Sequence, residues 1–582
     1  MSTSIESPST AHLTQTQLDN WLAGLSGISV TTGPSAEELQ ASLSWRVTRP
    51  MRAVRARERL SGLRQGRLTL PVHHADLSAL FESRTALHQR LTEVAPHLLP
   101  DVPVSEFGAM STDALLGAIA ARVHERNQSS ELWMLIIAVS GCFPDQAMLQ
   151  GLQRDITGVA AHDAIHRLLN HCAVWTTRHH SQLRTLKVVS DRRVAFADQT
   201  AKFGFNSGIQ RVTRQILSHW DEKAYELVAL TTDGTALRTV TNAERQRVVQ
   251  WSNEHARDDL VKDQKVNRKV EFEDTTSVLV VPWKTTFFTP EVPVGRGTDT
   301  LTALARYSPN RTIALGYDTI PVSSGHLVPR HLSGLFVSYL SMLKYFTEVI
   351  AISEAVNGEF TGFAEAAATQ GLPPFTVSTL VLPLERIEAG DSLEPVEAPP
   401  LPLVVSVGSN EPRKNQLSVI FASEVLWRQG LQFSLLLLGG SGDREMTAVP
   451  DAVAALSSQG RSIEQRRDVD EVELAAAYRQ ARFTVFISVQ EGYGLPVAES
   501  LAVGTPVLAT GYGSTAEIAA GGGCLTVDPR DDDDIVAGMR QLLTDDALLD
   551  RLHSEITARV DSTWADYSRS LWQLTATNQD SE

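Results

Sequence analysis

The stretch FTVFISVQEGYGLPVAESLAVGTPVLAT, residues 483–510, decides the fold of this chain. Its apolar beginning, 483–487, predicts a buried parallel strand that ends in a polar turn. Pro496 then stands in the first turn of a helix, where proline is tolerated, and Gly504 ends that helix. A second apolar strand begins after Pro506. The stretch therefore predicts a strand–helix–strand unit of a doubly wound α/β sheet, which binds ligands at the carboxyl ends of its strands.

Two carboxylates stand out in this unit. Glu491 lies on the turn, and Glu499 follows eight residues later in the helix. Gly492 and Gly494 let the backbone approach a ligand closely, and the adjacent helix N-terminus offers N–H groups to a phosphate. One acid would then contact a sugar and the other a ribose. In the alternative, Glu491 only complements the helix dipole and Glu499 lies on a solvated face; spacing alone leaves both interpretations open.

The residues around the two glutamates favour the first interpretation. The Gly-Tyr-Gly turn, the Leu-Pro and the Gly-Thr-Pro-Val occur together with them, and EGYGLPVAESLAVGTPVLAT resembles the donor-site signature of the retaining glycosyltransferases of family 4. The resemblance implies that Glu491 contacts the transferred sugar and Glu499 the nucleotide ribose. It also implies further donor-binding positions at Gly208, Ser409, Gly492, Tyr493, Gly494 and Leu495.

A pair of cations precedes the next expected helix. In LPLVVSVGSNEPRKNQ, a strand at 403–407 runs into Gly408, and Arg413 and Lys414 follow shortly after it. The family places a basic residue here against the nucleotide diphosphate, a purpose that arginine or lysine at the end of a strand suits. The alternative is a surface turn that carries two charges.

Shorter similarities to the family extend into the preceding 200 residues. GIQRVTRQIL, YDTIP and ISEAV resemble segments of the amino-terminal half of family 4 enzymes, and they occur in the expected order. Asp318, in YDTIP, matches an aspartate of the family and is a candidate catalytic residue beside Glu491. Family members often carry a histidine just before this aspartate, whereas this chain has Tyr317. The departure puts the role of the side chain at this position in doubt.

Composition limits the classes of protein. A formal charge of -16 argues against a nucleic-acid binder driven by bulk electrostatics. The three cysteines are far apart in the sequence, so neither a disulfide framework nor a zinc site is predicted, and a reduced cytosolic compartment fits. The first residues do not resemble a signal peptide. The apolar run 132–139 is far shorter than the ~20 residues that a membrane helix needs.

The chain is expected to contain four parts. Residues 1–35 predict a disordered start, 36–185 a helical domain, 186–385 a Rossmann-like acceptor domain and 400–582 a Rossmann-like nucleotide-sugar domain with a C-terminal helix. The stretch 382–400, rich in Pro and Glu, is the expected linker.

Two groups of residues resemble metal ligands, a histidine pair and an aspartate run. In the helical domain, His162 and His166 are four residues apart and could share a metal ion, but ordinary surface histidines are favoured. The run 531–534 is interpreted as a solvated helix start after Pro529, and no metal site is predicted.

An arginine-rich segment at 45–67 is unusual in so acidic a chain. Its arginines alternate with Trp45, Met51 and Leu60, a composition suited to an anionic membrane surface. The alternative is an internal docking face, because Pro50 interrupts a continuous helix.

Together, the resemblance implies a GT-B fold: two Rossmann-like domains with a cleft between them, preceded by the helical extension. It implies metal-independent transfer of a sugar from a nucleotide-sugar donor, with retained anomeric configuration, and no other cofactor. The expected acceptor is a glycan, lipid-linked or protein hydroxyl in bacterial surface-glycan assembly, in the cytoplasm with possible peripheral membrane contact. The competing hypothesis is a GT-B scaffold that has lost catalysis; the joint presence of Arg413, Lys414, Glu491 and Glu499 argues against it.

Overall fold

The computed structural model describes residues 15–25, 77–204, 206–251, 277–386, 400–439, 447–467, 469–560 and 562–576. The chain divides into two compact units, one formed by residues 1–188 and 271–281 and the other by 189–270 and 282–582. The arginine-rich segment 45–67 and most of the expected linker lie outside the described residues. The membrane prediction for 45–67 therefore stays a prediction.

The first unit is mainly helical. Its helices are α1 (Gln15–Leu25), α5 (Leu77–Leu98), α6 (Val104–Phe107), α7 (Thr112–Arg126), α8 (Ser129–Ser140), α9 (Gln146–Ile156) and α10 (Ala161–His179). The apolar run 132–139 is the buried centre of α8. Arg90 of α5 donates hydrogen bonds to the carbonyl oxygens of Ala138 and Val139, and so satisfies carbonyl groups at the end of α8.

Two boundaries of the first unit differ from the sequence prediction. The expected disordered start is wrong for 15–25, because α1 buries Leu18, Leu22 and Ala23 against its neighbours. The acceptor domain is predicted to begin at residue 186, yet most of strand β1 (Thr185–Val189) groups with the helical unit, together with most of β5 (Val278–Pro282), its neighbour in the sheet. Helical periodicity cannot show such a grouping, because strand pairing is non-local.

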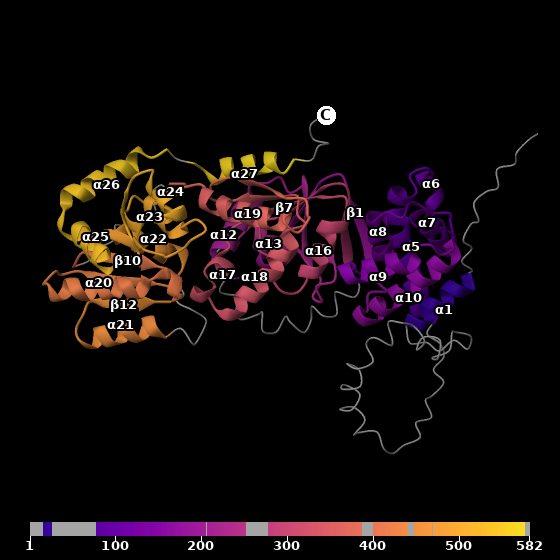
Figure 1. The fold of residues 1–582 in the computed structure, drawn as a ribbon, viewed down its shortest axis with the longest axis horizontal. Helices are drawn as coiled ribbons and strands as arrows, with labels where there is room; N and C mark the ends of the chain where they lie inside the picture. Colours follow the sequence, from indigo (N-terminus) through magenta and orange to yellow (C-terminus); the bar gives the residue numbers. More distant parts are fainter. Residues whose placement is uncertain are drawn as a thin grey trace, which may run out of the picture. The chain divides into compact units, whose positions relative to one another are not determined.

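The second unit contains two α/β domains (Figure 1). Within this unit, the strands of the first domain have the order β4-β3-β2-β6-β7-β8-β9. All neighbours in it are parallel except β3 and β4. The strands are β2 (Arg193–Phe196), β3 (Tyr225–Leu230), β4 (Leu237–Thr239), β6 (Thr286–Thr289), β7 (Arg311–Gly316), β8 (Glu348–Ala351) and β9 (Thr376–Thr379). The helices are α11 (Asp198–Lys202), α12 (Gly208–Ser218), α13 (Asn242–Val249), α16 (Thr298–Tyr307), α17 (Ile320–Ser323), η3 (Gly325–Leu327), α18 (Arg330–Leu343) and α19 (Glu354–Ala368).

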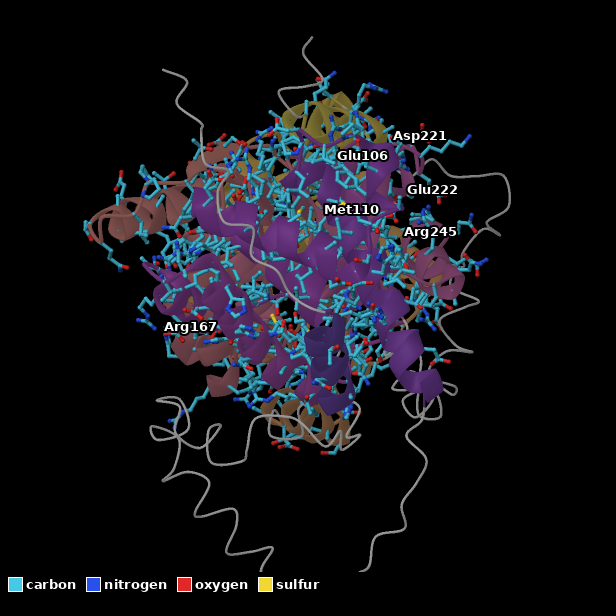
Figure 2. All side chains as sticks on the ribbon, turned by 90° about the vertical axis from the view of Figure 1, so that its right-hand side faces the viewer. Glu106, Met110, Arg167, Asp221, Glu222 and Arg245 are labelled. Carbon is cyan, nitrogen blue, oxygen red and sulfur yellow. The ribbon has the colours of Figure 1, made fainter. Side chains whose placement is uncertain are left out.

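Charged side chains of this first α/β domain also form pairs at its surface. Arg245 of α13 lies 3.0 Å from Glu222, and Figure 2 labels both residues. Such exposed pairs contribute only ~0–1 kcal/mol to stability, because solvent screens them. The buried ion pairs of the site, described below, are less screened by solvent than these exposed pairs.

The second α/β domain is a fully parallel sheet of order β12-β11-β10-β13-β14-β15. Its strands are β10 (Leu403–Val407), β11 (Ser434–Leu438), β12 (Ile463–Arg466), β13 (Phe483–Phe486), β14 (Val507–Thr510) and β15 (Cys524–Val527). The helices are η4 (Pro412–Lys414), α20 (Gln416–Arg428), α21 (Ala448–Ser458), α22 (Glu471–Gln480), α23 (Leu495–Ala502), α24 (Gly513–Ala519), α25 (Asp532–Thr544) and α26 (Asp546–Ala558). The predicted strand–helix–strand unit is β13, α23 and β14.

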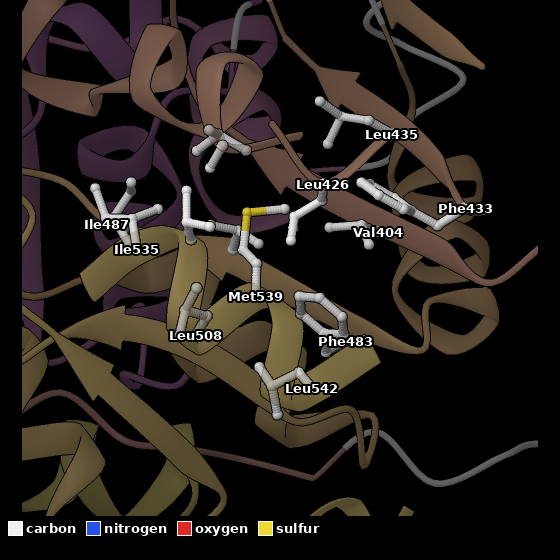
Figure 3. Packing of buried hydrophobic residues seen from close by; sticks show 14 of the residues in the cluster. Val404, Leu426, Phe433, Leu435, Phe483, Ile487, Leu508, Ile535, Met539 and Leu542 are labelled. Carbon is white, nitrogen blue, oxygen red and sulfur yellow. The ribbon is translucent and has the colours of Figure 1, made fainter. Parts of the chain in front are cut away.

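The hydrophobic core around this sheet explains why the sequences of its strands are continuous apolar runs. Val404, Leu435, Phe483 and Leu508 come from four neighbouring strands and pack against Met539 of α25 (Figure 3). Helices cover both faces of a parallel sheet, so its strands are apolar at successive positions rather than alternating. That burial fixes the strand order, and the strand order in turn places the loops that carry the site.

The last helix, α27 (Trp564–Leu574), follows the second sheet in sequence but packs on the first domain (Figure 1). Trp220 donates its indole N–H to the carbonyl oxygen of Ser568 at 3.1 Å, and the Ser568 hydroxyl donates to that of Ile216 at 2.9 Å. The guanidinium of Arg193 stacks 3.5 Å from the centre of the Trp572 ring. The chain thus crosses twice between its two α/β domains.

Candidate functional site

The site is built at the point where the strand order of the second sheet reverses. Strands β10 and β13 are neighbours, but their following helices lie on opposite sides, so the loops after them diverge and leave room for a ligand. The loop after β10 carries Arg413 and Lys414, and the loop after β13 carries Glu491. Residues that are 77 and 78 positions apart in sequence therefore meet.

Glu491 is held by both cations. Its Oε1 accepts hydrogen bonds from Lys414 Nζ at 2.6 Å and from Arg413 Nη1 at 2.9 Å. Arg413 also donates through Nε to Glu411 at 2.7 Å, which fixes the plane of the guanidinium. All three side chains of the cluster are largely buried, so the interactions are stronger than those of a surface pair.

The cluster sets the charge of each member. Burial alone would raise the pKa of Glu491, but contact with Lys414 and Arg413 outweighs burial and lowers that pKa below its usual range. Burial lowers the pKa of Lys414, and the neighbouring Glu491 opposes this effect. Glu491 is therefore an ionised carboxylate at neutral pH, and Arg413 and Lys414 form a cationic wall beside it.

Two helix N-termini meet at the boundary between the two α/β domains. Gly208 is the first residue of α12 and Leu495 the first residue of α23, and a Cβ added to Gly208 would lie 3.1 Å from Leu495 Cδ1. Gly494 adopts a φ of 108° just before α23, a conformation that glycine tolerates. The free N–H groups and partial positive charge of each helix start suit a phosphate. Both helix starts can thus act on one anion, and the α23 start follows Glu491 by four residues.

Glu499, one turn into α23, contacts both α/β domains. Tyr478 of α22 donates a hydrogen bond to Oε2 at 2.9 Å, and Arg211 of α12 places Nη2 2.5 Å from Oε1. The second contact is an ion pair without hydrogen-bond alignment, and it leaves Oε1 buried. Sequence reasoning missed Arg211 and Tyr478, since neither belongs to the motif; the GIQRVTRQIL segment was the one signal near Arg211.

Asp318 lies at the carboxyl end of β7 in the first domain. Its Oδ1 accepts the N–H of Ile320 at 3.0 Å, and burial raises its pKa to about 6 although Arg413 acts in the opposite direction. A Cβ on Gly492 would overlap the carbonyl oxygen of Tyr317 and lie 3.3 Å from Asp318 Cβ. Glycine at 492 thus lets the two loops touch, and this contact brings Asp318 to the loop of Glu491.

Tyr317, which stands where family members often carry a histidine, makes a structural hydrogen bond through its side chain. The Tyr317 hydroxyl donates to the carbonyl oxygen of Pro290 at 2.7 Å and is buried. Its backbone, rather than its phenol, meets the second domain. Tyr493 behaves similarly: its hydroxyl donates to the carbonyl oxygen of Leu382 at 2.8 Å, beside the linker. Ser409 donates to Glu411 at 2.9 Å.

Further hydrogen bonds join the two domains around these loops. Gln490, next to Glu491, donates to Glu359 at 2.7 Å and accepts from Ser324 at 2.5 Å. Glu517 of α24 accepts the N–H groups of Glu354 and Ala355 at the start of α19, at 2.9 and 2.7 Å. Sequence reasoning missed these partners, because the roles of such half-buried polar groups depend on a contact between domains.

A cavity of about 610 Å³ extends from Glu499 along this boundary. Residues of α12 line one side of it, including Arg211, and residues of α22 and α23 line the other, including Glu471 and Ala498. Its volume lies within the range of small-ligand pockets, and its lining combines apolar side chains with a few charged groups. The cavity can therefore hold the ribose end of a nucleotide beside Glu499.

The described residues contain no cluster of three or more histidine, cysteine or acidic side chains that could hold a metal ion. His162 and His166 lie on the surface of α10 with their Nε2 atoms 3.2 Å apart. Asp531 caps α25 by accepting the N–H groups of Asp533 and Asp534, so the acidic run is the helix start that was predicted. None of the helices in the described part of the chain is long and apolar enough to cross a membrane.

Comparison with known proteins finds a family that matches the segment carrying much of the site. The family described as "Glycosyl transferases group 1" matches residues 394–559, which contain the cation pair and both glutamates. O-antigen chain mannosyltransferase B of Escherichia coli is 32% identical over 145 residues, which are 24% of this chain and 36% of that protein. Serotype-specific mannosyltransferase WbdA of Escherichia coli is 28% identical over 107 residues, 18% of this chain and 13% of that protein. The chain thus covers well under half the length of these relatives.

Two solved structures resemble the chain at low sequence identity. Sucrose-phosphate synthase from Thermosynechococcus elongatus has a TM-score of 0.45 and 16% identity, and the match covers 67% of this chain and 100% of that chain. The Anabaena protein HepE in complex with UDP and glucose has a TM-score of 0.44 and 14% identity, with 66% and 99% covered.

Proposed function

We propose that this chain, in which residues 394–559 form a group 1 glycosyltransferase domain, transfers a sugar from a nucleotide sugar to a hydroxyl group of a surface glycan under assembly. The family match, together with one parallel and one mainly parallel sheet, confirms the predicted GT-B class. The observation that carries the proposal is the contact of Arg413 and Lys414 with Glu491, whose loop leads into the N-terminus of α23. Because the two Escherichia coli relatives described above are mannosyltransferases, mannose is the first sugar to test.

The proposed chemistry follows from the charges. A nucleoside diphosphate that leaves the sugar gains negative charge, and Arg413, Lys414 and the helix N–H groups stabilise it. The anomeric carbon becomes positively charged, and an ionised Glu491 orients the sugar and stabilises that charge from nearby. The acceptor oxygen attacks the carbon on the face that the diphosphate leaves, so the configuration is retained, and the departing phosphate oxygen takes the acceptor proton.

The donor and acceptor occupy different sides in this proposal. Glu499 accepts the ribose hydroxyls when the ribose displaces Arg211 from Oε1, and the cavity receives the nucleoside. The acceptor enters from the first domain, past Asp318. Positive charge comes from side chains and helix ends, so we expect turnover without a divalent cation; loss of turnover in EDTA that magnesium or manganese restores would contradict this point.

The experiment compares wild type with Arg413→Gln/Lys414→Met. Wild type is incubated with a panel of nucleotide sugars that includes GDP-mannose, and release of nucleoside diphosphate is followed with and without a soluble glycan acceptor. The variant should bind nucleoside diphosphate more weakly by calorimetry, since each charge-assisted contact contributes ~1.5–3 kcal/mol. A matched control replaces two exposed cations of the same chain, Lys223→Met/Arg428→Gln.

The same experiment distinguishes an enzyme from the competing hypothesis, a GT-B scaffold that has lost catalysis. A protein that binds nucleoside diphosphate but turns over no donor, even with acceptor, would be a GT-B scaffold rather than an enzyme. Equal diphosphate affinity of wild type and the Arg413/Lys414 variant would overturn the placement of the diphosphate.

A further inference from the structure

Glu359, a half-buried residue in the second turn of α19, holds the loop that follows β7. Its Oε2 accepts the backbone N–H of Thr319 at 2.8 Å and the hydroxyl of the same residue at 2.7 Å. Thr319 directly follows Asp318, so this N–H belongs to the peptide bond between the two residues. One oxygen of Glu359 thus fixes the backbone that carries Asp318.

The other oxygen of Glu359 reaches the second α/β domain. Its Oε1 accepts a hydrogen bond from Gln490 Nε2 at 2.7 Å, and Gln490 directly precedes Glu491. A single carboxylate therefore joins the residue after Asp318 to the residue before Glu491. We call the contacts of Glu359 with Thr319 and Gln490 the Glu359 bridge.

The chemistry of the bridge gives the Gln490 side chain one orientation. A carboxylate accepts hydrogen bonds but donates none, so Gln490 directs its amide NH₂ group towards Glu359. Its Oε1 then accepts from the hydroxyl of Ser324 at 2.5 Å, and its Nε2 donates to the hydroxyl of Ser323 at 3.1 Å. Both polar atoms of the Gln490 side chain are thus bonded to the first domain, which holds the start of the Glu491 loop.

The charge of Glu359 also acts on Asp318. Burial raises the pKa of Asp318 to about 6, Arg413 acts in the opposite direction, and the negative charges of Glu359 and Glu491 add to the rise. Such an effect falls off with distance, so it reports that Glu359 lies near the acid as well as near its backbone.

A second carboxylate joins the two domains at the same helix. Glu517 of α24 accepts the N–H groups of Glu354 and Ala355 at the start of α19, at 2.9 and 2.7 Å. These partners are not the sequence neighbours of Asp318 or Glu491. Removal of Glu517 therefore measures what the loss of a contact between the domains costs by itself.

We propose that Glu359 is a positioning residue, which fixes Asp318 on the acceptor side relative to Glu491 on the donor side through Thr319 and Gln490. The inference rests on the proposed function for the reaction that is positioned, but the bridge itself does not require sugar transfer. Reacting groups need accurate placement, and a displacement of ~1 Å can lower a rate about a hundredfold. Glu359 acts through its two neighbours rather than on the substrate.

The first test reports on the two loops without donor or acceptor. Hydrogen–deuterium exchange is compared in wild type, Glu359→Ala and Glu517→Ala. In Glu359→Ala the N–H of Thr319 loses its acceptor, so this amide and the segment 488–492 should exchange about threefold faster or more. In Glu517→Ala the faster exchange should be confined to residues 354 and 355. Unchanged exchange at Thr319 in Glu359→Ala would overturn the bridge.

The second test separates turnover from donor binding. Turnover is measured with GDP-mannose, or with whichever member of the nucleotide-sugar panel wild type uses, and the matching nucleoside diphosphate is titrated by calorimetry. Glu359→Ala should lower turnover about ten- to hundredfold. Its affinity for nucleoside diphosphate should stay within about twofold of wild type, because Arg413, Lys414 and Glu499 are unchanged. A loss of affinity as large as the loss of turnover would overturn the positioning role.

The conservative variant Glu359→Gln distinguishes position from charge. Its amide oxygen can accept from Thr319, and its NH₂ group can donate to a Gln490 amide that has flipped, so the bridge can form without the negative charge. Glu359→Gln should therefore restore most of the turnover that Glu359→Ala loses. Turnover as low as that of Glu359→Ala would assign the effect to charge and overturn the proposal.

Glu517 and Gln490 supply the matched comparisons. Glu517→Ala should keep most of the turnover, and a loss equal to that of Glu359→Ala would make Glu359 an ordinary contact between domains. Gln490→Ala breaks the same bridge as Glu359→Ala, so the double variant should lose about as much turnover as Glu359→Ala alone. Losses that multiply in this pair would overturn the bridge as the route of the effect.

The two tests also distinguish this inference from the proposed function. A wild-type protein that turns over no nucleotide sugar would contradict the proposed function and with it a role of Glu359 in transfer, while the bridge itself stands or falls with the exchange at Thr319. Full turnover of Glu359→Ala in an active protein would overturn the positioning role and leave the proposed function standing.

Discussion

Two carboxyl groups of the site, Glu491 after β13 and Asp318 after β7, differ in protonation although burial raises the pKa of both. Two cations touch Glu491 directly, and its pKa falls below the usual range. Asp318 receives one backbone N–H from Ile320 within hydrogen-bond distance, and its pKa is about 6. The difference teaches that direct cation contact, more than depth of burial, decides which carboxyl of this cleft can carry a proton.

The largest effect should come from removing the negative charge of Glu491, the carboxyl that the two cations contact. Glu491→Gln keeps the shape of the side chain but deprives the sugar of a carboxylate. We expect turnover to fall about 10²–10³-fold, the loss typical for one preorganised electrostatic group. Nucleoside diphosphate affinity should be kept or increased, because Arg413 and Lys414 become free for the phosphate.

Steady-state kinetics and calorimetry on the same preparation check this prediction. Glu365→Gln, an exposed glutamate on α19, serves as the matched control. A Glu491 variant that loses plain diphosphate affinity and keeps its turnover would reverse the roles assigned to the two glutamates.

The second prediction concerns the other carboxyl and its pH dependence. The folded pKa of Asp318 is raised from the usual 3.8 to about 6, so the folded protein retains a proton that the unfolded chain releases. This group therefore contributes stability below pH ~4 that is lost as pH rises through ~6, a change of at most about 3 kcal/mol. Glu491 has the opposite sign: its contribution is present above its unfolded pKa and is lost as pH falls.

Urea unfolding between pH 4 and 7 tests the sign. In Asp318→Asn the decline in unfolding free energy over this interval should be smaller than in wild type, whereas Asp299→Asn, an exposed control, should follow wild type. An unchanged decline in the Asp318 variant would contradict the raised pKa.

Glu499 is a third carboxyl of the site, and its cationic partner, Arg211, belongs to the first α/β domain. Glu499→Gln should weaken nucleoside diphosphate binding about tenfold, since one hydrogen bond from a ribose hydroxyl to a charged acceptor is lost. The same variant should bind a 2′,3′-dideoxynucleoside diphosphate as wild type does. Calorimetry with both nucleotides measures the two affinities, and an equal loss for both would place Glu499 away from the ribose.

The smallest effect is expected at Arg211. Its ion pair with Glu499 competes with the ribose, so Arg211→Gln should tighten nucleoside diphosphate binding a few-fold. The gain should vanish in a Glu499→Gln background, as a double-mutant cycle would show. Arg551→Gln on the exposed side of α26 is the control. A gain of the same size in both backgrounds would mean that Arg211 acts on the nucleotide by another route.

Much of the second α/β domain could be predicted from the sequence. The strands at 403–407 and 483–487, the helix that carries Pro496 and the cap of α25 follow from local patterns. Local physical causes operate there: apolar runs mark buried strands, and proline, glycine and aspartate mark helix ends. The grouping of β1 with the helical unit could not be predicted, because it depends on which distant segment a strand pairs with.

By itself the sequence determined the α/β class and the residues that carry charge at the site, Arg413, Lys414, Glu491 and Glu499, because motif and strand end coincide there. Only the tertiary structure decided how these charges are used. It places both cations on one oxygen of Glu491, sends Arg211 across to Glu499, and brings Gly492 against the backbone of Tyr317. These contacts join residues far apart in the chain. Their energies depend on distance and burial, which a linear sequence does not contain.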